Sequence, residues 1–266
     1  MSGRWYAGAL APARFTTGVS IAKAVAAAAA LSCATLSRAG VPFVTDDPEP
    51  VDYRAWEVNY ALTGTRVRDA TTAFLPQVDI NYGAAPGVQL HLQPQIAYAD
   101  AAGTRTLGIG DTEIGVKYRL TPESEDARDW MVGLYPRVQI PTGNANRNLG
   151  AGSSSVYLPL WLQTTRGAWT NYGGGGYWIN SGSGNRNAWA AGWVVLYQFT
   201  EALQMGGEVF WKGADTAGGR SSSGFNAGAI YSLAKDYRLL LSAGRGLSDA
   251  AATNQVSVYL GLQVAY

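Results

Sequence analysis

The sequence predicts an all-β protein, specifically a transmembrane antiparallel up-and-down β-barrel of about 12 strands. Polar and apolar residues alternate through successive stretches, and in a strand this alternation makes one face polar and the other apolar. The connections between the stretches alternate between short turns and longer loops, as in bacterial outer-membrane barrels. The 266 residues include 33 Gly, 9 Trp and 15 Tyr but only 15% charged residues. Such a composition is typical of a β protein whose surface contacts an apolar medium.

Residues 1–39 are predicted to be an export signal. A basic start precedes an apolar run over 24–36, and the small residues Ser37 and Ala39 fit the two positions that a signal peptidase reads before Gly40. A membrane-anchoring helix and a lipidation site at Cys33 are weaker alternatives. Removal of the four basic residues of this leader takes the formal net charge from +1 to −3, which argues against a nucleic-acid partner. Cys33, the only cysteine, would leave with the leader.

Residues 40–52 contain three prolines and cannot form a regular element. They are predicted to be an N-terminal periplasmic extension ahead of a barrel over 53–266. Asp46 and Asp47 could bind a cation, or they could cap or salt-bridge a periplasmic plug. Two carboxylates fall far short of a calcium loop, so the second interpretation is favoured.

The first five predicted strands show the clearest alternation. In the third strand, Leu90 and His91 fall on opposite faces. In the fourth, Ile114 and Val116 lie on the face opposite Lys117. No apolar stretch of about 20 residues follows the leader, which excludes a helical membrane protein. These five strands are predicted over 53–62, 71–82, 88–98, 108–120 and 130–140.

The last seven predicted strands follow the same pattern with two variations. The stretch 155–163 is apolar on both sides, and the glycine run 173–176 hides the phase of its strand. That run lacks the Lys-Ser/Thr of a phosphate loop, and it either lets the strand bend or leaves room in the lumen. The last strand ends on an aromatic residue, Tyr266, which resembles the C-terminal signal read by the outer-membrane assembly machinery. The seven strands are predicted over 155–163, 169–179, 188–199, 203–212, 224–233, 237–245 and 255–266.

The two faces of the strands predict where the protein resides. In water, a barrel of about twelve strands would enclose a cavity too wide for its own side chains, because about eight strands already fill the interior. With the apolar face turned outward, the barrel would contact the lipid of a Gram-negative outer membrane and enclose a polar lumen. Aromatic residues near the predicted strand ends fit the girdles of such barrels. They are Trp56, Tyr82, Tyr98, Tyr118, Trp130, Trp189 and Trp211.

The polar faces of the second to fifth strands supply the candidate site residues. Their charged members could form an ion-pair ladder that stabilises the wall, or a constriction that selects solutes by charge. No catalytic, cofactor or metal site is expected, because the mature chain has no Cys–His metal spacing. The lumen-lining candidates are Asp79, Gln89, His91, Gln93, Gln95, Asp111, Glu113, Lys117, Arg119, Arg137 and Gln139.

Three functional classes fit this barrel. The favoured class is a channel for passive passage of small, partly apolar solutes, because small and apolar residues share the predicted lumen face. A structural or adhesive barrel with a plugged lumen is the second class. The third, an outer-membrane hydrolase, is disfavoured because His91, the sole histidine, is predicted in the lumen near the periplasmic turn. The small residues are Gly115, Gly133, Gly206, Gly228, Gly244 and Gly261, and the apolar ones are Tyr135, Phe210, Ile230 and Leu240.

A family resemblance rests on motifs spread along the whole mature chain. They include PFVTDDP at 42–48, WEV at 56–58, GIGDTEIGVKY at 108–118, IPTG at 140–143, LPLWLQ at 158–163, residues 172–180, and SAGR at 242–245. With these motifs the chain resembles the bacterial family labelled "putative MetA-pathway of phenol degradation". The resemblance implies a transporter-like outer-membrane barrel, in some members linked to the breakdown of aromatic compounds. It assigns no substrate or role to any individual residue.

Overall fold

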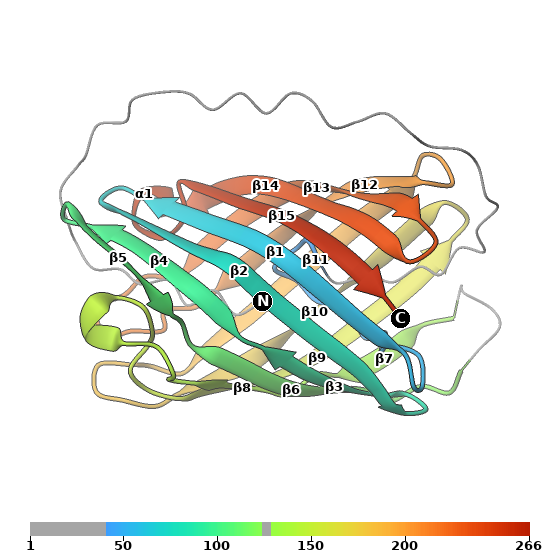
Figure 1. Cartoon of the computed structure of the whole chain (residues 1–266), viewed down its shortest axis with the longest axis horizontal. Coiled ribbons are helices and arrows are strands. Elements are labelled where there is room, and N and C mark those ends of the chain that lie inside the picture. The colour runs from blue at the N-terminus through green and yellow to red at the C-terminus, as the bar shows by residue number, and fades with distance from the viewer. Residues whose placement is uncertain (1–40, 124–128) are drawn as a thin grey trace.

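Backbone pairing between successive strands closes the chain into a barrel (Figure 1). The computed structural model describes residues 41–123 and 129–266, so the predicted leader lies outside the described residues. The strands are β1 (Trp56–Val67), β2 (Ala70–Ala85), β3 (Val88–Gln93), β4 (Gln95–Ala101), β5 (Thr104–Ile109), β6 (Thr112–Arg119), β7 (Met131–Leu134), β8 (Arg137–Ile140), β9 (Ser155–Arg166), β10 (Trp169–Asn180), β11 (Ala188–Gln198), β12 (Leu203–Lys212), β13 (Ser222–Ala234), β14 (Tyr237–Ser248) and β15 (Val256–Ala265). Two short helices, η1 (Ala145–Arg147) and α1 (Ala250–Thr253), lie in loops.

The ring closes between the first and last strands. β15 pairs antiparallel with β1, from Glu57 opposite Ala265 to Arg66 opposite Val256. In the described part of the chain, the 15 segments form twelve long strands, because β3 continues into β4, β5 into β6, and β7 into β8. The predicted antiparallel barrel and its strand number are therefore confirmed.

Three strands predicted as continuous, 88–98, 108–120 and 130–140, are each split. Pro94 and Pro136 cause two of the breaks because proline has no N–H to donate to the ladder. The wall stays paired there through the proline carbonyls, which accept from Val78 N and Val116 N at 3.1 Å each. The third break, at 110–111, lets Asp111 turn toward the loop 141–154, whose backbone it binds.

The first strand spans other residues than the predicted 53–62. β1 begins at Trp56 because Tyr53 still belongs to the segment that leaves the lumen, where it bridges to Gly83. At its other end β1 continues to Val67, which faces Ala70 across a tight turn. The loop predicted over 63–70 is therefore mostly strand, because its polar residues extend the ladder.

The orientation of the two faces follows the predicted inside-out pattern. Leu90 and Leu92 are 47% and 42% exposed on the outer surface, whereas Gln89 and His91 between them are 4% and 6% exposed. An apolar exterior with paired backbone groups is what a lipid environment requires. Several aromatic residues predicted for the girdles, including Trp56, Trp130 and Trp189, are exposed on the outside.

The connections differ between the two ends of the barrel (Figure 1). One end, here called the turn end, carries the start of β1, the end of β15 and mostly short connections such as 86–87 and 167–168. The other, the loop end, carries the loop 141–154 and the connection that contains α1. In bacterial barrels the short turns are periplasmic. This pattern predicts that the turn end is the periplasmic end.

Helices contribute little to this architecture. Within residues 41–123 and 129–266, no helix has the length and apolar character needed to cross a membrane.

Candidate solute pathway

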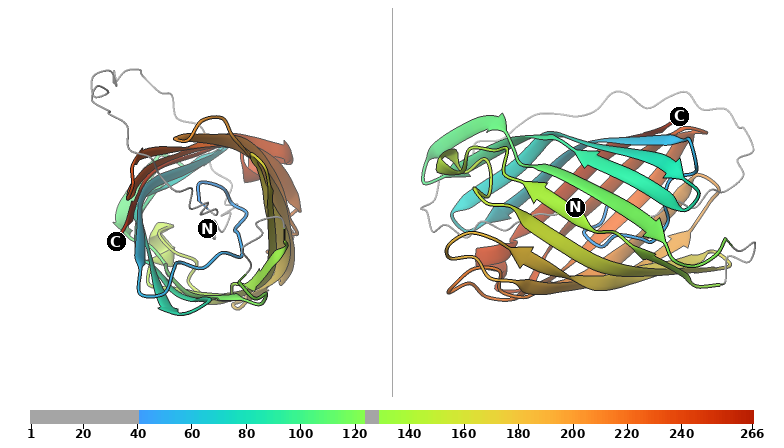
Figure 2. Two further views of the ribbon diagram at one scale, coloured as in Figure 1. Left: turned by 90° about the vertical axis from the view of Figure 1, so that its right-hand side faces the viewer. Right: turned by 90° about the horizontal axis from the view of Figure 1, so that it is seen from below.

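Residues 41–52, here called the plug, lie inside the barrel (Figure 2, left). The buried side chains of Phe43 and Asp47 show how deeply the plug is enclosed, at 2% and 0% exposure. The plug contacts strands around much of the ring, from Ser242 on β14 to Gln89 on β3. The plug therefore runs across the lumen from one side of the wall to another.

Two buried cations of the wall bind the carboxylates of the plug. Lys117 Nζ lies 3.1 Å from Asp46 Oδ1 and 3.3 Å from Asp47 Oδ1. Arg137 Nη1 lies 3.4 Å from Asp46 Oδ2 and 3.6 Å from Glu113 Oε1. The salt-bridging role predicted for the Asp46–Asp47 pair is confirmed.

The two adjacent carboxyl groups differ in pKa because their surroundings differ. Burial by itself raises the pKa of Asp46, but the charges of Lys117 and Arg137 outweigh it and lower the pKa to about 2. At Asp47 burial prevails over Lys117, and the negative charges of Asp46 and Glu49 add to it. The pKa of Asp47 is therefore raised well above its ordinary value.

A carboxylate on β12 binds the backbone of the plug. The N–H groups of Val44 and Thr45 donate to Glu208 Oε2 at 2.9 and 3.1 Å. Asn226 Nδ2 donates to the other oxygen of Glu208 at 3.0 Å. Because the plug has no regular structure to pair its own amides, this carboxylate satisfies donors that would otherwise be buried without partners.

Further hydrogen bonds fix the two ends and the middle of the plug. Gln89 Oε1 accepts from Val51 N at 2.8 Å, and Gln163 Nε2 donates to Glu49 Oε2 at 3.0 Å. Ser242 Oγ donates to the carbonyl of Pro42 at 2.6 Å. Side chains from six different long strands therefore make polar contacts with the segment. Phe43 of the plug adds apolar packing in a buried cluster with residues such as Tyr172 and Leu240.

Glycines of the wall make room for the plug. A Cβ at Gly228 would lie 2.8 Å from the Phe43 ring, and one at Gly133 would lie 2.9 Å from Pro48. These two glycines were predicted to leave space for passage. That expectation is wrong at both positions, because the plug fills the space beside them.

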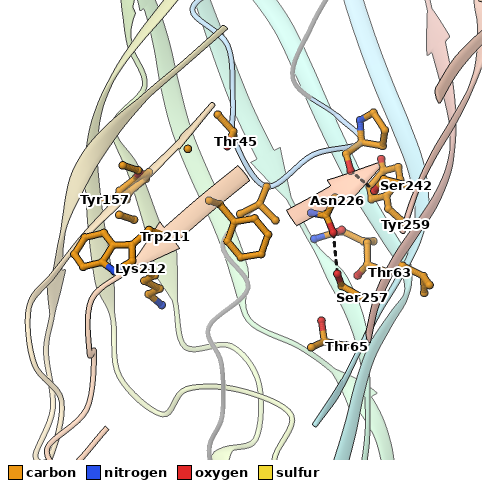
Figure 3. Close-up of a pocket in the computed structure, with 18 of the residues that line it drawn as sticks. Thr45, Thr63, Thr65, Tyr157, Trp211, Lys212, Asn226, Ser242, Ser257 and Tyr259 are labelled. Atoms are coloured by element: carbon orange, nitrogen blue, oxygen red, sulfur yellow. Dashed lines mark hydrogen bonds between the residues drawn. The ribbon is translucent and has the colours of Figure 1, made fainter. Parts of the chain in front are cut away.

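A cavity of about 150 Å³ lies on the loop side of the plug (Figure 3). Pro42, Val44 and Thr45 of the plug line it together with wall residues of the loop-end half, such as Thr65 and Lys212. In Figure 3, Tyr157 and Lys212 lie on one side of the cavity and Asn226, Ser257 and Tyr259 on the opposite side. Its aromatic wall includes Tyr157 and Trp178, whose rings stack at 4.4 Å.

A second, smaller cavity of about 40 Å³ lies toward the turn end and is polar. His91 is buried in its wall, with Nδ1 2.9 Å from Asp79 Oδ1 and 3.0 Å from Asn81 Oδ1. His91 Nε2 lies 3.5 Å from Glu113 Oε1. In the described chain no serine hydroxyl is hydrogen-bonded to His91.

The structure brings together some of the predicted lumen residues and separates others. Glu113, Lys117 and Arg137 meet at the plug. Asp111 instead accepts from Gly143 N and Ala151 N of the long loop at 3.0 and 2.6 Å. The remaining candidates divide among three settings: Asp79, Gln89 and His91 face the turn-side cavity, Gln93 and Gln95 bind Gln77, and Gln139 binds Asp111.

Arg119 lies apart from the plug contacts. Its Nη2 donates to the carbonyl of Pro122 at 3.0 Å, in the connection at the turn end. Neither cavity is lined by this residue. The five predicted charged residues of this region therefore do not form one continuous cluster; they are Asp111, Glu113, Lys117, Arg119 and Arg137.

Sequence reasoning missed residues that contact the plug or line the loop-side cavity. Glu208 was not among the predicted lumen-lining residues, although it is an isolated acid beside two glycines in a predicted strand. Trp161 and Tyr157 lie on β9, whose apolar character on both faces was the available signal. Neither signal indicates what the side chain contacts, because Glu208 binds the plug and the rings of Tyr157 and Trp161 pack with residues of other strands.

No metal site is found among the described residues: no group of three or more His, Cys, Asp or Glu side chains could hold an ion. This finding fits the polar partners described above for His91, Asp46 and Asp47.

The apolar exterior, the closed twelve-stranded ladder and the plugged polar lumen define an outer-membrane β-barrel of a Gram-negative bacterium. The profile of the family described as "Putative MetA-pathway of phenol degradation" matches residues 54–263. The chain belongs to this family. No curated protein matches the chain.

Solved structures share the fold at low sequence identity. An outer membrane channel from Pseudomonas putida F1 is 15% identical, with a TM-score of 0.70, over 83% of this chain and 98% of that one. The KdgM porin is 12% identical, with a TM-score of 0.54, over 79% and 99%. The β domain of the Bordetella autotransporter BrkA is 15% identical, with a TM-score of 0.51, over 80% and 99%. At these identities the likeness establishes the barrel fold.

Proposed function

We propose that the protein is an outer-membrane channel for small, partly apolar solutes and that the plug closes it in this structure. The observation that carries the proposal is the loop-side cavity, which lies inside the lumen and ends on the plug. A cavity that faces the outer surface and has aromatic walls suits the entry of partly apolar molecules. The family and the channel and porin folds that the barrel resembles support this class.

Passage requires the plug to move, and its bonds are of a kind that can exchange. Its polar contacts are ion pairs and hydrogen bonds, and water or a solute can replace these partners when the segment leaves. Phe43 is the main apolar contact that must also separate. The first strand begins at Trp56, so residues 41–52 can leave the lumen without breaking the ladder of the wall. A closed state and an open state can therefore share one barrel.

A reversible lock tests the proposal. A Cβ at Gly192 would lie 3.2 Å from Thr45 Cβ, near the separation that a disulfide needs. We expect the Thr45→Cys/Gly192→Cys protein in planar bilayers to conduct only after reduction, and each single variant to conduct under both conditions. Equal conductance of the oxidised and reduced double variant, once its disulfide is verified, would reject a channel gated by the plug.

A structural or adhesive barrel is the second candidate, because the plug is buried and held from several strands. Liposome swelling separates the two functions. A channel of the proposed kind admits phenol-like solutes faster than sugars of similar size when the lock is reduced. Swelling with neither solute in either redox state would favour the structural barrel.

We also propose that the outer-membrane assembly machinery recognises β15. The strand alternates along its length and Tyr266 is 70% exposed at its end, although its backbone pairs with Trp56. Tyr266→Ser should slow insertion of the barrel in cells without changing the conductance of the inserted fraction. Pulse-chase measurement of heat-modifiable, folded protein tests this, and unchanged insertion kinetics would contradict it.

A further inference from the structure

We propose that the loop-side cavity binds a small aromatic carboxylate and that this carboxylate competes with Asp46 for Arg137. Binding of the solute would thereby release the plug. This inference rests on the proposed channel function and names its ligand class and its trigger.

The charges that line the loop-side cavity favour an anion. Its lining residues in the described chain include two cations, Arg137 and Lys212, and no Asp or Glu. The turn-side cavity differs, because Asp46, Glu49, Glu57 and Asp79 are among its lining residues. The charged residues that line the loop-side cavity are therefore both positive, and one of them, Lys212, is paired with Asp215 at 2.7 Å, which leaves Arg137 as the principal attraction for an anion.

The hydrogen-bonding groups of the same cavity also favour an acceptor. Thr45 Oγ1, Arg137 Nε and Trp161 Nε1 belong to lining residues and are buried without a hydrogen-bond partner in the described chain. The unpaired buried oxygens of Gln163 and Asn254 belong to residues outside this lining. Because unpaired buried donors cost free energy, a ligand that brings acceptors is favoured over a donor-rich sugar.

The apolar walls define the rest of the ligand. Trp178 stacks on Tyr157 with an interplanar angle of 13°, and the Tyr157 and Trp161 rings lie 6.3 Å apart. An engineered apolar cavity of about 150 Å³ in another protein binds benzene. The cavity here has a similar volume, about 150 Å³, so one aromatic ring can fit beside these side chains.

Arg137 connects the cavity to the plug. It lines both cavities, and its guanidinium carbon lies 4.7 Å from the Tyr135 ring and 5.3 Å from the Tyr157 ring. Its contact with Asp46, at 3.4 Å, is longer than the roughly 2.8 Å of a strong charge-assisted hydrogen bond. A carboxylate on a solute offers Arg137 the same chemistry as Asp46, so the two compete for one cation.

Competition predicts opposite effects of two substitutions. Arg137→Gln removes the shared cation and should weaken benzoate binding at least tenfold. Asp46→Asn removes the competitor and should strengthen benzoate binding several-fold. By the reciprocity of linked equilibria, a solute that releases the plug must bind more tightly once the plug is weakened. A purely structural role of Arg137 would not produce this pair of opposite changes.

The experiment is calorimetric titration of the full-length barrel in nanodiscs with benzoate and, as the neutral probe, benzyl alcohol. Arg119→Gln is the matched control, because Arg119 is a cation of the same wall outside both cavities. We expect this control to bind benzoate like the wild type, and benzyl alcohol to bind weakly and equally to every variant. In bilayers, benzoate on the loop side should raise the open fraction of the wild type.

Several results would overturn the inference. Benzoate binding that matches benzyl alcohol, or that is unchanged in Asp46→Asn, excludes competition even if Arg137→Gln fails to fold. Equal losses in Arg137→Gln and Arg119→Gln would show a general effect of charge. The disulfide lock separates this outcome from failure of the channel itself: conductance that depends on reduction but not on benzoate retains the channel and rejects the trigger.

Discussion

Lys117 shows how one buried residue can link two parts of the chain. Its ammonium group binds Asp46 and Asp47, which lie about 70 positions earlier in the sequence. A buried ion pair is costly to break because the remaining charge stays in a poorly solvated site. The two carboxyl groups that share Lys117 therefore make docking of the plug sensitive to protonation.

The pH dependence of docking follows from the raised pKa of Asp47. A carboxyl group whose pKa is raised in the docked state binds its proton more tightly there, so docking is strongest at low pH and weakens as pH rises through the raised pKa. The pKa of Asp46 is lowered to about 2, so Asp46 stays ionised and its contribution is lost only near that pH. We expect conductance in bilayers to fall as pH is lowered through the raised pKa of Asp47 toward the ordinary value of an aspartate, about 4, by up to roughly tenfold per unit for one titrating group.

Asp47→Asn tests whether Asp47 is the titrating group. The groups that face it are Asp46, Glu49 and Lys117. The amide cannot ionise, so the variant should lose most of the pH dependence over this range and keep a constant conductance. A pH profile that is the same in the variant and the wild type would assign the dependence to another group.

At the scale of elements, the interior face of β13 is shaped to the plug. Gly228 lies in the middle of this strand, where a residue with a side chain would ordinarily pack better. The ring of Phe43 occupies the space that such a side chain would need. The absence of a side chain at Gly228 therefore makes room on β13 for the aromatic ring of the plug.

Gly228→Ala should weaken docking of the plug. The new Cβ would lie 2.8 Å from Phe43 Cζ and 2.7 Å from the backbone oxygen of Leu241 on the next strand, and overpacking of this kind costs about 1–3 kcal/mol. That cost corresponds to a shift of roughly 5- to 150-fold toward the open state, measured as open probability in bilayers. Phe43→Leu/Gly228→Ala should restore part of the closed population, because the smaller side chain relieves the contact with the plug but not the contact with Leu241. An open probability that the alanine leaves unchanged would show that Phe43 does not set docking.

The whole molecule is organised by the direction in which its apolar face points. Leu90 and Val116 are exposed on the outside of the ring, whereas Thr65 lines the loop-side cavity. Lipid can solvate the outer positions, and water can solvate the position in the cavity. The orientation therefore determines which small molecules reach each side chain.

Spin labels measure this orientation directly. In reconstituted barrels, nitroxides at Leu90→Cys and Val116→Cys should relax mainly with oxygen, which concentrates in lipid. A nitroxide at Thr65→Cys should relax mainly with a water-soluble nickel chelate, with a severalfold difference in the ratio of the two accessibilities. A higher nickel accessibility at Leu90 than at Thr65 would contradict the inside-out barrel.

Much of this molecule was determined by the sequence itself. A period of two fixes the two faces of a strand locally, so the alternation around Leu90 and His91 predicted strands, faces and barrel without any tertiary contact. The sequence also contained the information for the breaks at Pro94 and Pro136, because a proline has no N–H to donate and interrupts a ladder wherever it falls. These breaks were nevertheless not predicted.

Only the tertiary structure decided what fills the lumen. Residues 41–52 have no period, and their partners Glu208, Arg137 and Gly228 lie far away in sequence, so the match exists only after the barrel has closed. The same closure placed Asp111 on the long loop and Arg119 at the turn end, although both share a strand face with Lys117. The physical reason is that local periodicity sets the direction of a side chain, whereas the identity of its partner depends on which distant residue the curvature of the barrel brings within reach.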